Sequence, residues 1–115
     1  MLEFVKCLSQ WDIWTCDFAD AGPHPAVTFS HPDRVARAPL VNVLIASSQQ
    51  ASRPARENEM VLNGAKGLDW ETLVKCDLMY LVEKDWLYPH RGSVSAARCR
   101  ALVQRLNACF GLTLL

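Results

Sequence analysis

The sequence has 115 residues, which is enough for one domain with a single hydrophobic core and too few for two, so we expect one domain over residues 1–115. Half of the residues are hydrophobic and about a fifth are charged, which excludes a disordered chain. The 12 Lys and Arg residues balance 12 Asp and Glu residues, so the overall basic charge of many nucleic-acid-binding proteins is missing. Any site for RNA or DNA is therefore expected to be a local patch.

Cysteine spacing gives a first indication of the compartment. The five cysteines are far apart, odd in number and without a CxxC pair, which does not suit a disulfide framework or a zinc cluster. We therefore expect reduced cysteines buried in the core of a cytoplasmic protein. The N-terminus lacks the pattern of a signal peptide, and no apolar run reaches the length needed to span a membrane. The cysteines are Cys7, Cys16, Cys76, Cys99 and Cys109.

Two strands are predicted in the first third of the chain. Residues 11–18 form the first, with alternate side chains on one face. The turn-forming residues 19–24 follow, and residues 25–30 form the second strand. Residues 31–38 are expected to be a simple connection to the next apolar segment. The side chains expected to share one face of the first strand are Trp14, Cys16 and Phe18.

Residues 40–49 are the most continuously apolar run of the sequence and are rich in β-branched residues. This pattern predicts a strand that is buried on both faces, as in the middle of a barrel or sandwich. The run ends in the polar residues 47–49, which we expect at the rim of the core and regard as the place to look for function. Val41, Val43 and Ile45 are expected on one face, and Leu44 and Ala46 on the other.

The middle of the chain is polar before it becomes strand-like again. Residues 50–58 lack periodicity and are expected to form a mobile loop that carries Arg53 and Arg56. Residues 59–62 predict a short strand, and residues 63–71 a compact connection that opens with an Asn-Gly turn signal.

A long strand is predicted over residues 72–82. Side-chain alternation places Lys75 and Asp77 on one face, so two opposite charges interrupt an otherwise apolar stripe. The pair calls for an explanation, either a functional site or a structural ion pair. Leu73 and Met79 are expected beside the charges, and Val74, Cys76 and Leu78 on the other face.

The C-terminal part combines short elements with one helix. Residues 83–86 predict a helical turn, and after a lead over residues 87–90 a last strand covers residues 91–94. Ser95 is the expected N-cap of an amphipathic helix that Gly111 ends. The arginines of this helix are expected on its solvated face. The apolar face comprises Cys99, Leu102, Val103, Leu106, Cys109 and Phe110.

About six short strands, long polar loops and one C-terminal helix define the expected fold. The fold class is mainly β, a small and nearly closed antiparallel barrel with the helix packed across one end. No internal repeat is visible.

Several segments also have a familiar order. The first strand contains Asp12-Ile13-Trp14 and Asp17-Phe18, and it is followed by Gly22, by His24-Pro25-Ala26-Val27 and by Ser30. Further along come Ser47-Ser48-Gln49, Val74-Lys75-Cys76-Asp77 and Gly92-Ser93-Val94-Ser95. Over nearly the whole chain, this order resembles the MazF/PemK (Kid) family of toxin endoribonucleases.

The resemblance implies an SH3-like barrel that dimerises, is neutralised by a small antitoxin and cuts single-stranded RNA without a metal or other cofactor, leaving a 2′,3′-cyclic phosphate. The family's catalytic positions fall on His24, Ser47, Lys75 and Asp77. Arginines stand in the family where this chain has His24 and Lys75, so both guanidinium groups are absent. The residues expected to contact RNA are Ser48, Gln49, Arg53 and Arg56.

These side chains provide the groups that RNA transesterification needs, namely a base, an acid and positive donors. Asp77 or His24 can act as the base, protonated His24 and Lys75 can supply a proton and charge, and Ser47 can bond a phosphate oxygen. The alternatives are a Lys75–Asp77 ion pair, an exposed turn histidine, and a serine that only closes its strand.

Three functions follow as hypotheses. The first is the endoribonuclease toxin of a type II toxin–antitoxin pair, cleaving single-stranded RNA or mRNA in the cytoplasm as a homodimer. The second is a barrel of the same family that has lost catalysis and works as a binding or regulatory module, because both arginines are replaced. The third is an SH3-like peptide-binding domain, which would need exposed aromatic residues clustered with acidic ones.

Overall fold

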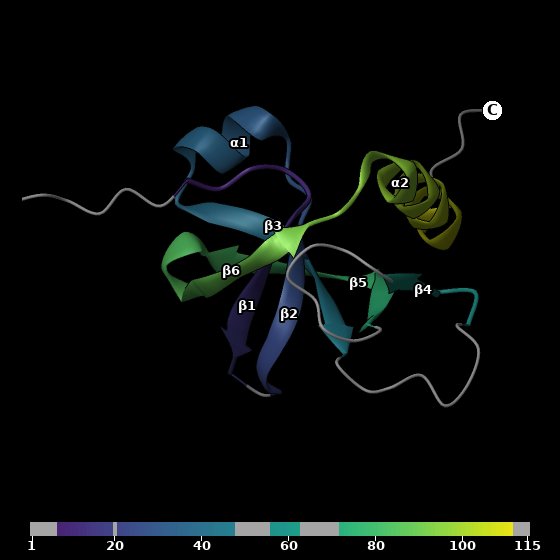
Figure 1. Cartoon of the computed structure of the whole chain (residues 1–115), viewed down its shortest axis with the longest axis horizontal. Coiled ribbons are helices and arrows are strands. Elements are labelled where there is room, and N and C mark those ends of the chain that lie inside the picture. The colour runs from purple at the N-terminus through teal and green to yellow at the C-terminus, as the bar shows by residue number, and fades with distance from the viewer. Residues whose placement is uncertain (1–6, 20, 48–55, 63–71, 112–115) are drawn as a thin grey trace, which may run out of the picture.

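The computed structural model describes residues 7–19, 21–47, 56–62 and 72–111, and in them it contains strands, two α-helices and a short 3-10 turn (Figure 1). None of the helices in these ranges is long and apolar enough to cross a membrane. The elements are β1 (Asp12–Phe18), β2 (Gly22–Thr28), α1 (Pro32–Arg37), β3 (Leu40–Ser47), β4 (Glu59–Leu62), β5 (Thr72–Glu83), η1 (Lys84–Trp86), β6 (Leu87–Ser93) and α2 (Ala96–Phe110).

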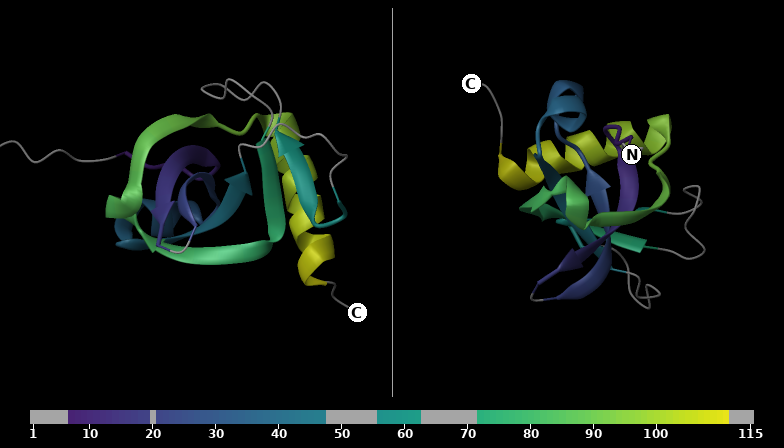
Figure 2. Two further views of the ribbon diagram at one scale, coloured as in Figure 1. Left: turned by 90° about the horizontal axis from the view of Figure 1, so that it is seen from below. Right: turned by 90° about the vertical axis from the view of Figure 1, so that its left-hand side faces the viewer.

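The strands form one antiparallel sheet in the order β4-β5-β3-β2-β1-β6. Figure 2 shows that the sheet curls into a half-barrel and that α2 runs alongside β4 and β5, both of which it contacts. The predicted mainly-β fold with a C-terminal helix is therefore confirmed.

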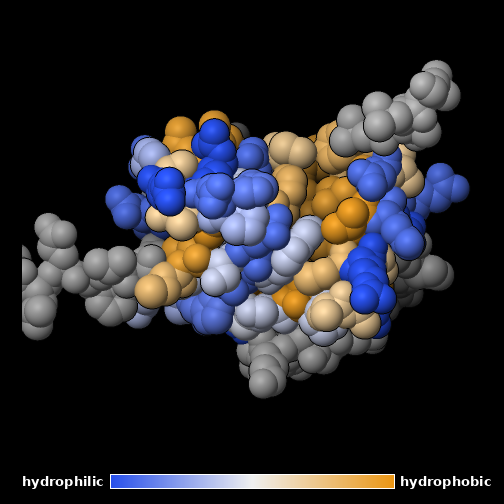
Figure 3. Space-filling model, turned by 90° about the horizontal axis from the view of Figure 1, so that it is seen from above, coloured by the Kyte–Doolittle hydropathy of each residue, from blue (hydrophilic) through white to orange (hydrophobic). Residues whose placement is uncertain are grey.

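β3 is buried on both faces, as its continuous apolar run predicts. Val41 and Val43 belong to the core inside the curl, with Trp14, Cys16 and Phe18 of β1. Leu44 and Ala46 belong to a second core, which Leu102 of α2 covers. From above, Figure 3 shows polar residues over the α1 side of the molecule and a group of apolar residues toward α2.

β5 carries the main irregularity of the sheet. Leu44 of β3 pairs with Met79, but Ala46 pairs with Val74, so β5 has extra residues between these two positions. Such a bulge bends a strand and changes the direction of its side chains. The extra residues leave β3, and Lys75 pairs with Glu59 of β4 instead. The bulge thereby fixes which charged groups reach each side of the sheet.

The bulge also corrects the predicted faces of this strand. Leu73 lines the same pocket as Lys75, as alternation predicts, and Val74 and Cys76 lie in the core. Leu78, expected beside Val74 and Cys76, is 40% exposed, because the extra residues shift the phase of the alternation.

Three other boundaries differ from the sequence-based expectation. The segment predicted as a connection contains α1, where the Nδ1 of His31 accepts the backbone N–H of Asp33 and Val35 is buried. Six residues are too few to show helical periodicity in a sequence. β2 starts at Gly22, whose φ of 78° suits glycine, and β6 starts at Leu87, because both segments find pairing partners on β1.

Candidate functional site

A pocket of about 290 Å³ lies where β2, β3, β4 and β5 come together. Three of the four predicted catalytic residues line it: His24, Ser47 and Lys75. A buried carboxylate that the sequence analysis did not select, that of Glu59, lines it too. The other described residues that line it are Ile45, Ala46 and Leu73.

His24 is half-buried in β2, opposite Cys16 of β1. Its Nε2 lies 3.0 Å from the carbonyl oxygen of Ala21. Because a carbonyl oxygen only accepts, Nε2 carries the proton of this hydrogen bond, and Nδ1 is the acceptor nitrogen of the neutral ring. The imidazole also lies near Phe18, with a centroid separation of 6.4 Å. These contacts orient the ring and leave Nδ1 as the nitrogen that can exchange a proton.

Ser47 is the last residue of β3 and pairs with Leu73 of β5. It is half-buried, so its hydroxyl lies at the rim of the core, where the sequence analysis placed it. Because Ser47 ends the strand, strand pairing fixes its backbone while its short side chain lies at the pocket.

Lys75 and Glu59 are cross-strand partners on β5 and β4. The side chain of Lys75 is exposed, whereas Glu59 is 3% exposed. The Oε1 of Glu59 accepts the backbone N–H of Arg56 at 3.0 Å, and the backbone N–H of Glu59 donates to the carbonyl oxygen of Arg56 at 2.9 Å. This reciprocal pair holds the carboxylate, since a buried charge needs hydrogen-bond donors.

Asp77, the fourth predicted catalytic residue, lies in a different place. Its Oδ2 accepts a hydrogen bond from the side-chain amide of Asn58 at 3.0 Å. It lines a neighbouring pocket beside α2, together with Glu57 and Cys109. The carboxylate of Asp77 thus has Asn58 as its partner, and the alternative of a Lys75–Asp77 ion pair is not formed between these two described side chains.

Of the four residues expected to contact RNA, the structure describes one. Arg56 is exposed and precedes β4. The other three, Ser48, Gln49 and Arg53, lie outside the described residues.

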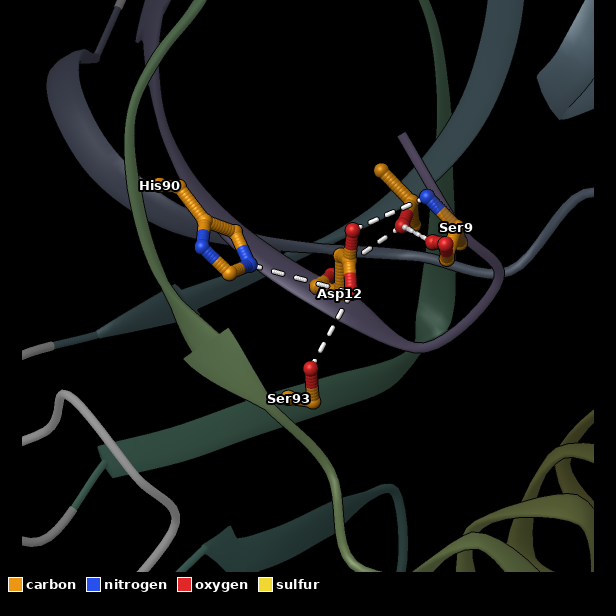
Figure 4. A network of polar contacts seen from close by, with 5 residues as sticks. Ser9, Asp12, His90 and Ser93 are labelled. Atoms are coloured by element: carbon orange, nitrogen blue, oxygen red, sulfur yellow. Dashed lines mark hydrogen bonds and ion pairs between the residues drawn. The ribbon is translucent and has the colours of Figure 1, made fainter. Parts of the chain in front are cut away.

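A second polar cluster surrounds Asp12, which is 8% exposed (Figure 4). Its carboxylate accepts the backbone N–H of Ser9 at 2.8 Å and the hydroxyl of Ser93 at 3.0 Å, and the Nε2 of His90 lies 3.7 Å away. Since Ser93 donates to the aspartate and not to the histidine, the arrangement does not activate a serine nucleophile. We interpret the cluster as a structural tie between β1 and β6.

None of the five cysteines lines the pocket that His24 and Ser47 share. All five are free thiols. Cys16 and Cys76 are buried, Cys99 and Cys109 are half-buried and Cys7 is exposed, which corrects the expectation that all are buried. Burial raises the pKa of Cys16 to about 11 and that of Cys76 to about 12, so both stay protonated and unreactive near neutral pH. In the described residues, no group of three or more His, Cys, Asp and Glu side chains could hold a metal ion.

Fold and pocket together define a curled antiparallel half-barrel with a C-terminal helix and a polar rim pocket. The sequence model of the PemK-like, MazF-like toxins of type II toxin–antitoxin systems matches residues 9–110. The chain therefore belongs to this family of toxins. No curated protein sequence matches it.

Solved structures share the fold at low sequence identity. An endoribonuclease from a mycobacterial species, in complex with its cognate antitoxin, is 18% identical with a TM-score of 0.80, covering 95% of this chain and 100% of that one. The Mycobacterium tuberculosis toxin MazF-mt6 is 16% identical with a TM-score of 0.76, covering 90% and 99%. MazE–MazF from Deinococcus radiodurans (Form-II) is 14% identical with a TM-score of 0.73, covering 95% and 100%.

Sequence reasoning missed Glu59, although it had placed this residue at the start of a short strand. A glutamate that opens an apolar strand is a weak signal, because most such residues are solvated. Its position opposite Lys75 depends on the register in which β4 pairs with β5, which the alternation within β4 does not reveal.

Proposed function

We propose that this chain is the toxin of a type II toxin–antitoxin pair and that it cleaves single-stranded RNA by transesterification without a metal ion. The observation that carries the proposal is the meeting of His24, Ser47 and Lys75 in one pocket of a chain that belongs to this toxin family. The three residues come from three strands, so their meeting is a product of the fold.

The proposed reaction forms a bond between the 2′-oxygen and phosphorus and breaks the bond from phosphorus to the 5′-oxygen. The Lys75 ammonium offsets the negative charge on the non-bridging oxygens, and the Ser47 hydroxyl donates a hydrogen bond to one of them. Protonated His24 gives the proton on Nδ1 to the leaving 5′-oxygen. The products are a 2′,3′-cyclic phosphate and a 5′-hydroxyl.

We further propose a homodimer in the cytoplasm whose activity a small cognate antitoxin blocks. The support is family membership and the similar solved structures, among which are an endoribonuclease in complex with its cognate antitoxin and MazE–MazF complexes.

A second candidate is a family member that has lost catalysis and acts as a binding or regulatory module. The observation that favours it is the pair His24 and Lys75, at positions where the family pattern has arginine. An arginine can hold a phosphate with two parallel hydrogen bonds, whereas lysine acts as a single point charge.

One experiment separates the two candidates. Purified protein is incubated with single-stranded RNA in excess chelator, and the product ends are analysed. We expect cleavage with cyclic-phosphate and 5′-hydroxyl ends. A folded protein that is silent, while the double variant His24→Arg, Lys75→Arg cuts RNA, identifies the degenerate relative instead.

A further inference from the structure

The proposed cleavage needs a group that takes the proton of the 2′-hydroxyl, and among the described residues that line the pocket there is one carboxylate. That carboxylate belongs to Glu59, the cross-strand neighbour of Lys75. Asp77, which sequence reasoning selected, lines the neighbouring pocket. We infer that Glu59, and not Asp77, is the general base of the site, an inference that rests on the proposed function.

The backbone around Glu59 sets the direction of its side chain. Asn58 and Glu59 are consecutive, and the amide of Asn58 turns to Asp77 while Glu59 lines the pocket with His24 and Ser47. The carbonyl of Asn58 accepts the N–H of Cys76 at 2.7 Å, which locks β4 to β5 between the two charged positions. At the start of β4, Glu59 therefore lines one pocket, while Asn58 binds Asp77 at the other.

The carboxylate of Glu59 is also held firmly. One oxygen accepts the Arg56 N–H, within the reciprocal pair of hydrogen bonds between these two residues. A base that is fixed in place loses little freedom when it meets the substrate, which favours proton transfer. Asp77, by contrast, is exposed to solvent.

With this assignment the step balances. Glu59 takes the proton of the 2′-hydroxyl as the 2′-oxygen bonds to phosphorus, and the 5′-oxygen leaves with the proton from Nδ1 of protonated His24. Glu59 ends protonated and His24 neutral, and proton exchange with water restores both. Lys75 lies next to the base, where its charge attracts the phosphate that the base must approach.

The test compares Glu59→Gln with the matched control Asp77→Asn in single-turnover cleavage of single-stranded RNA. Glutamine keeps an oxygen for the Arg56 N–H and nearly the same size but cannot take the proton. Since general bases contribute about 10²–10⁴-fold, we expect Glu59→Gln to lose at least about 100-fold and to lose the rise of rate with pH on the acidic side. Asp77→Asn should stay close to the parent.

Folding is checked by circular dichroism and thermal unfolding, and Glu59→Asp provides a second variant that retains a carboxylate. We expect Glu59→Asp to recover part of the rate together with the acidic limb of the pH profile. Residual rates that are equal in Glu59→Asp and Glu59→Gln, with both variants folded and both keeping the parent's pH profile, overturn the inference.

The outcomes also distinguish a failure of this inference from a failure of the proposed function. An active parent with an unaffected Glu59→Gln, or with the loss in Asp77→Asn instead, overturns the role of Glu59 and leaves the nuclease standing. A folded parent that cuts no RNA overturns both.

Discussion

Glu59 of β4 lies directly opposite Lys75 of β5, and both side chains line the pocket that His24 and Ser47 share. This cross-strand relationship puts a buried carboxylate beside an exposed ammonium group. The pairing register of β4 and β5 thus places the proposed proton acceptor, Glu59, beside the charge that attracts phosphate, Lys75. A shift of β5 against β4 by one residue would turn Lys75 to the other face of the sheet and separate it from Glu59.

The hydroxyl of Ser47 is expected to matter for the rate. Ser47→Ala removes a hydrogen bond to a charged phosphate oxygen, worth about 1.5–3 kcal/mol, so we expect a loss of about 10–100-fold in RNA cleavage. Ser47→Thr keeps the hydroxyl and is the control. Cleavage by Ser47→Ala at the parent's rate, measured under single-turnover conditions, would contradict the role given to this residue.

Lys75 is expected to act through its charge. Lys75→Gln should lower cleavage by about 100-fold, while Lys75→Arg should equal or exceed the parent, because a guanidinium group binds phosphate with two hydrogen bonds. The side chain is exposed, so neither change should alter the free energy of unfolding by more than about 0.5 kcal/mol. Arg100→Gln, an exposed cation on α2, is the matched control and should leave the rate unchanged. An equal loss of cleavage rate in Lys75→Gln and Arg100→Gln would mean that Lys75 only attracts RNA non-specifically, which contradicts its proposed role.

Asp12 is expected to stabilise the fold and not the reaction. Asp12→Ala leaves the Ser9 N–H and the Ser93 hydroxyl without their acceptor, which should lower the free energy of unfolding by about 2–4 kcal/mol. Ser93→Ala removes one donor and should cost about 1 kcal/mol. Urea unfolding followed by tryptophan fluorescence measures both. If Asp12→Ala leaves the free energy of unfolding unchanged, the cluster does not tie β1 to β6.

Cys16 makes stability depend on pH in the alkaline range. Burial, with a smaller contribution from Asp17, raises its pKa from 9.0 to about 11. The stabilisation is present below pH 9 and is lost as pH rises toward 11, because the unfolded chain releases a proton that the folded chain retains. At about 1.4 kcal/mol per pH unit, the loss amounts to about 2–3 kcal/mol.

The measurement is urea unfolding of the parent and Cys16→Ala at several pH values from 8 to 11. Alanine cannot titrate, so the stability advantage of the parent over Cys16→Ala should shrink above pH 9. Parallel pH dependence of the two proteins would mean that the Cys16 thiol ionises as easily in the folded chain as in the unfolded one.

The elements that the sequence predicts well are those determined by neighbouring residues. α2 starts and ends as expected, because Ser95 accepts the N–H of Arg98 and Gly111 adopts a φ of 63°, both local interactions. β3 is buried on both faces because its own side chains are apolar on both faces. α1 and the early start of β6 were missed, since each depends on burial or pairing with distant segments.

The same distinction between local sequence and tertiary structure applies to the candidate site. The resemblance in segment order singles out His24, Ser47 and Lys75 as expected site residues, and the structure brings these three to one pocket. Which carboxylate lines this pocket is decided by tertiary structure, because the β5 bulge and the pairing of β4 with β5 place Glu59 at the pocket and Asp77 at the neighbouring one. Strand register is set by contacts between segments far apart in the sequence, and a periodic pattern within one strand carries no information about its partner.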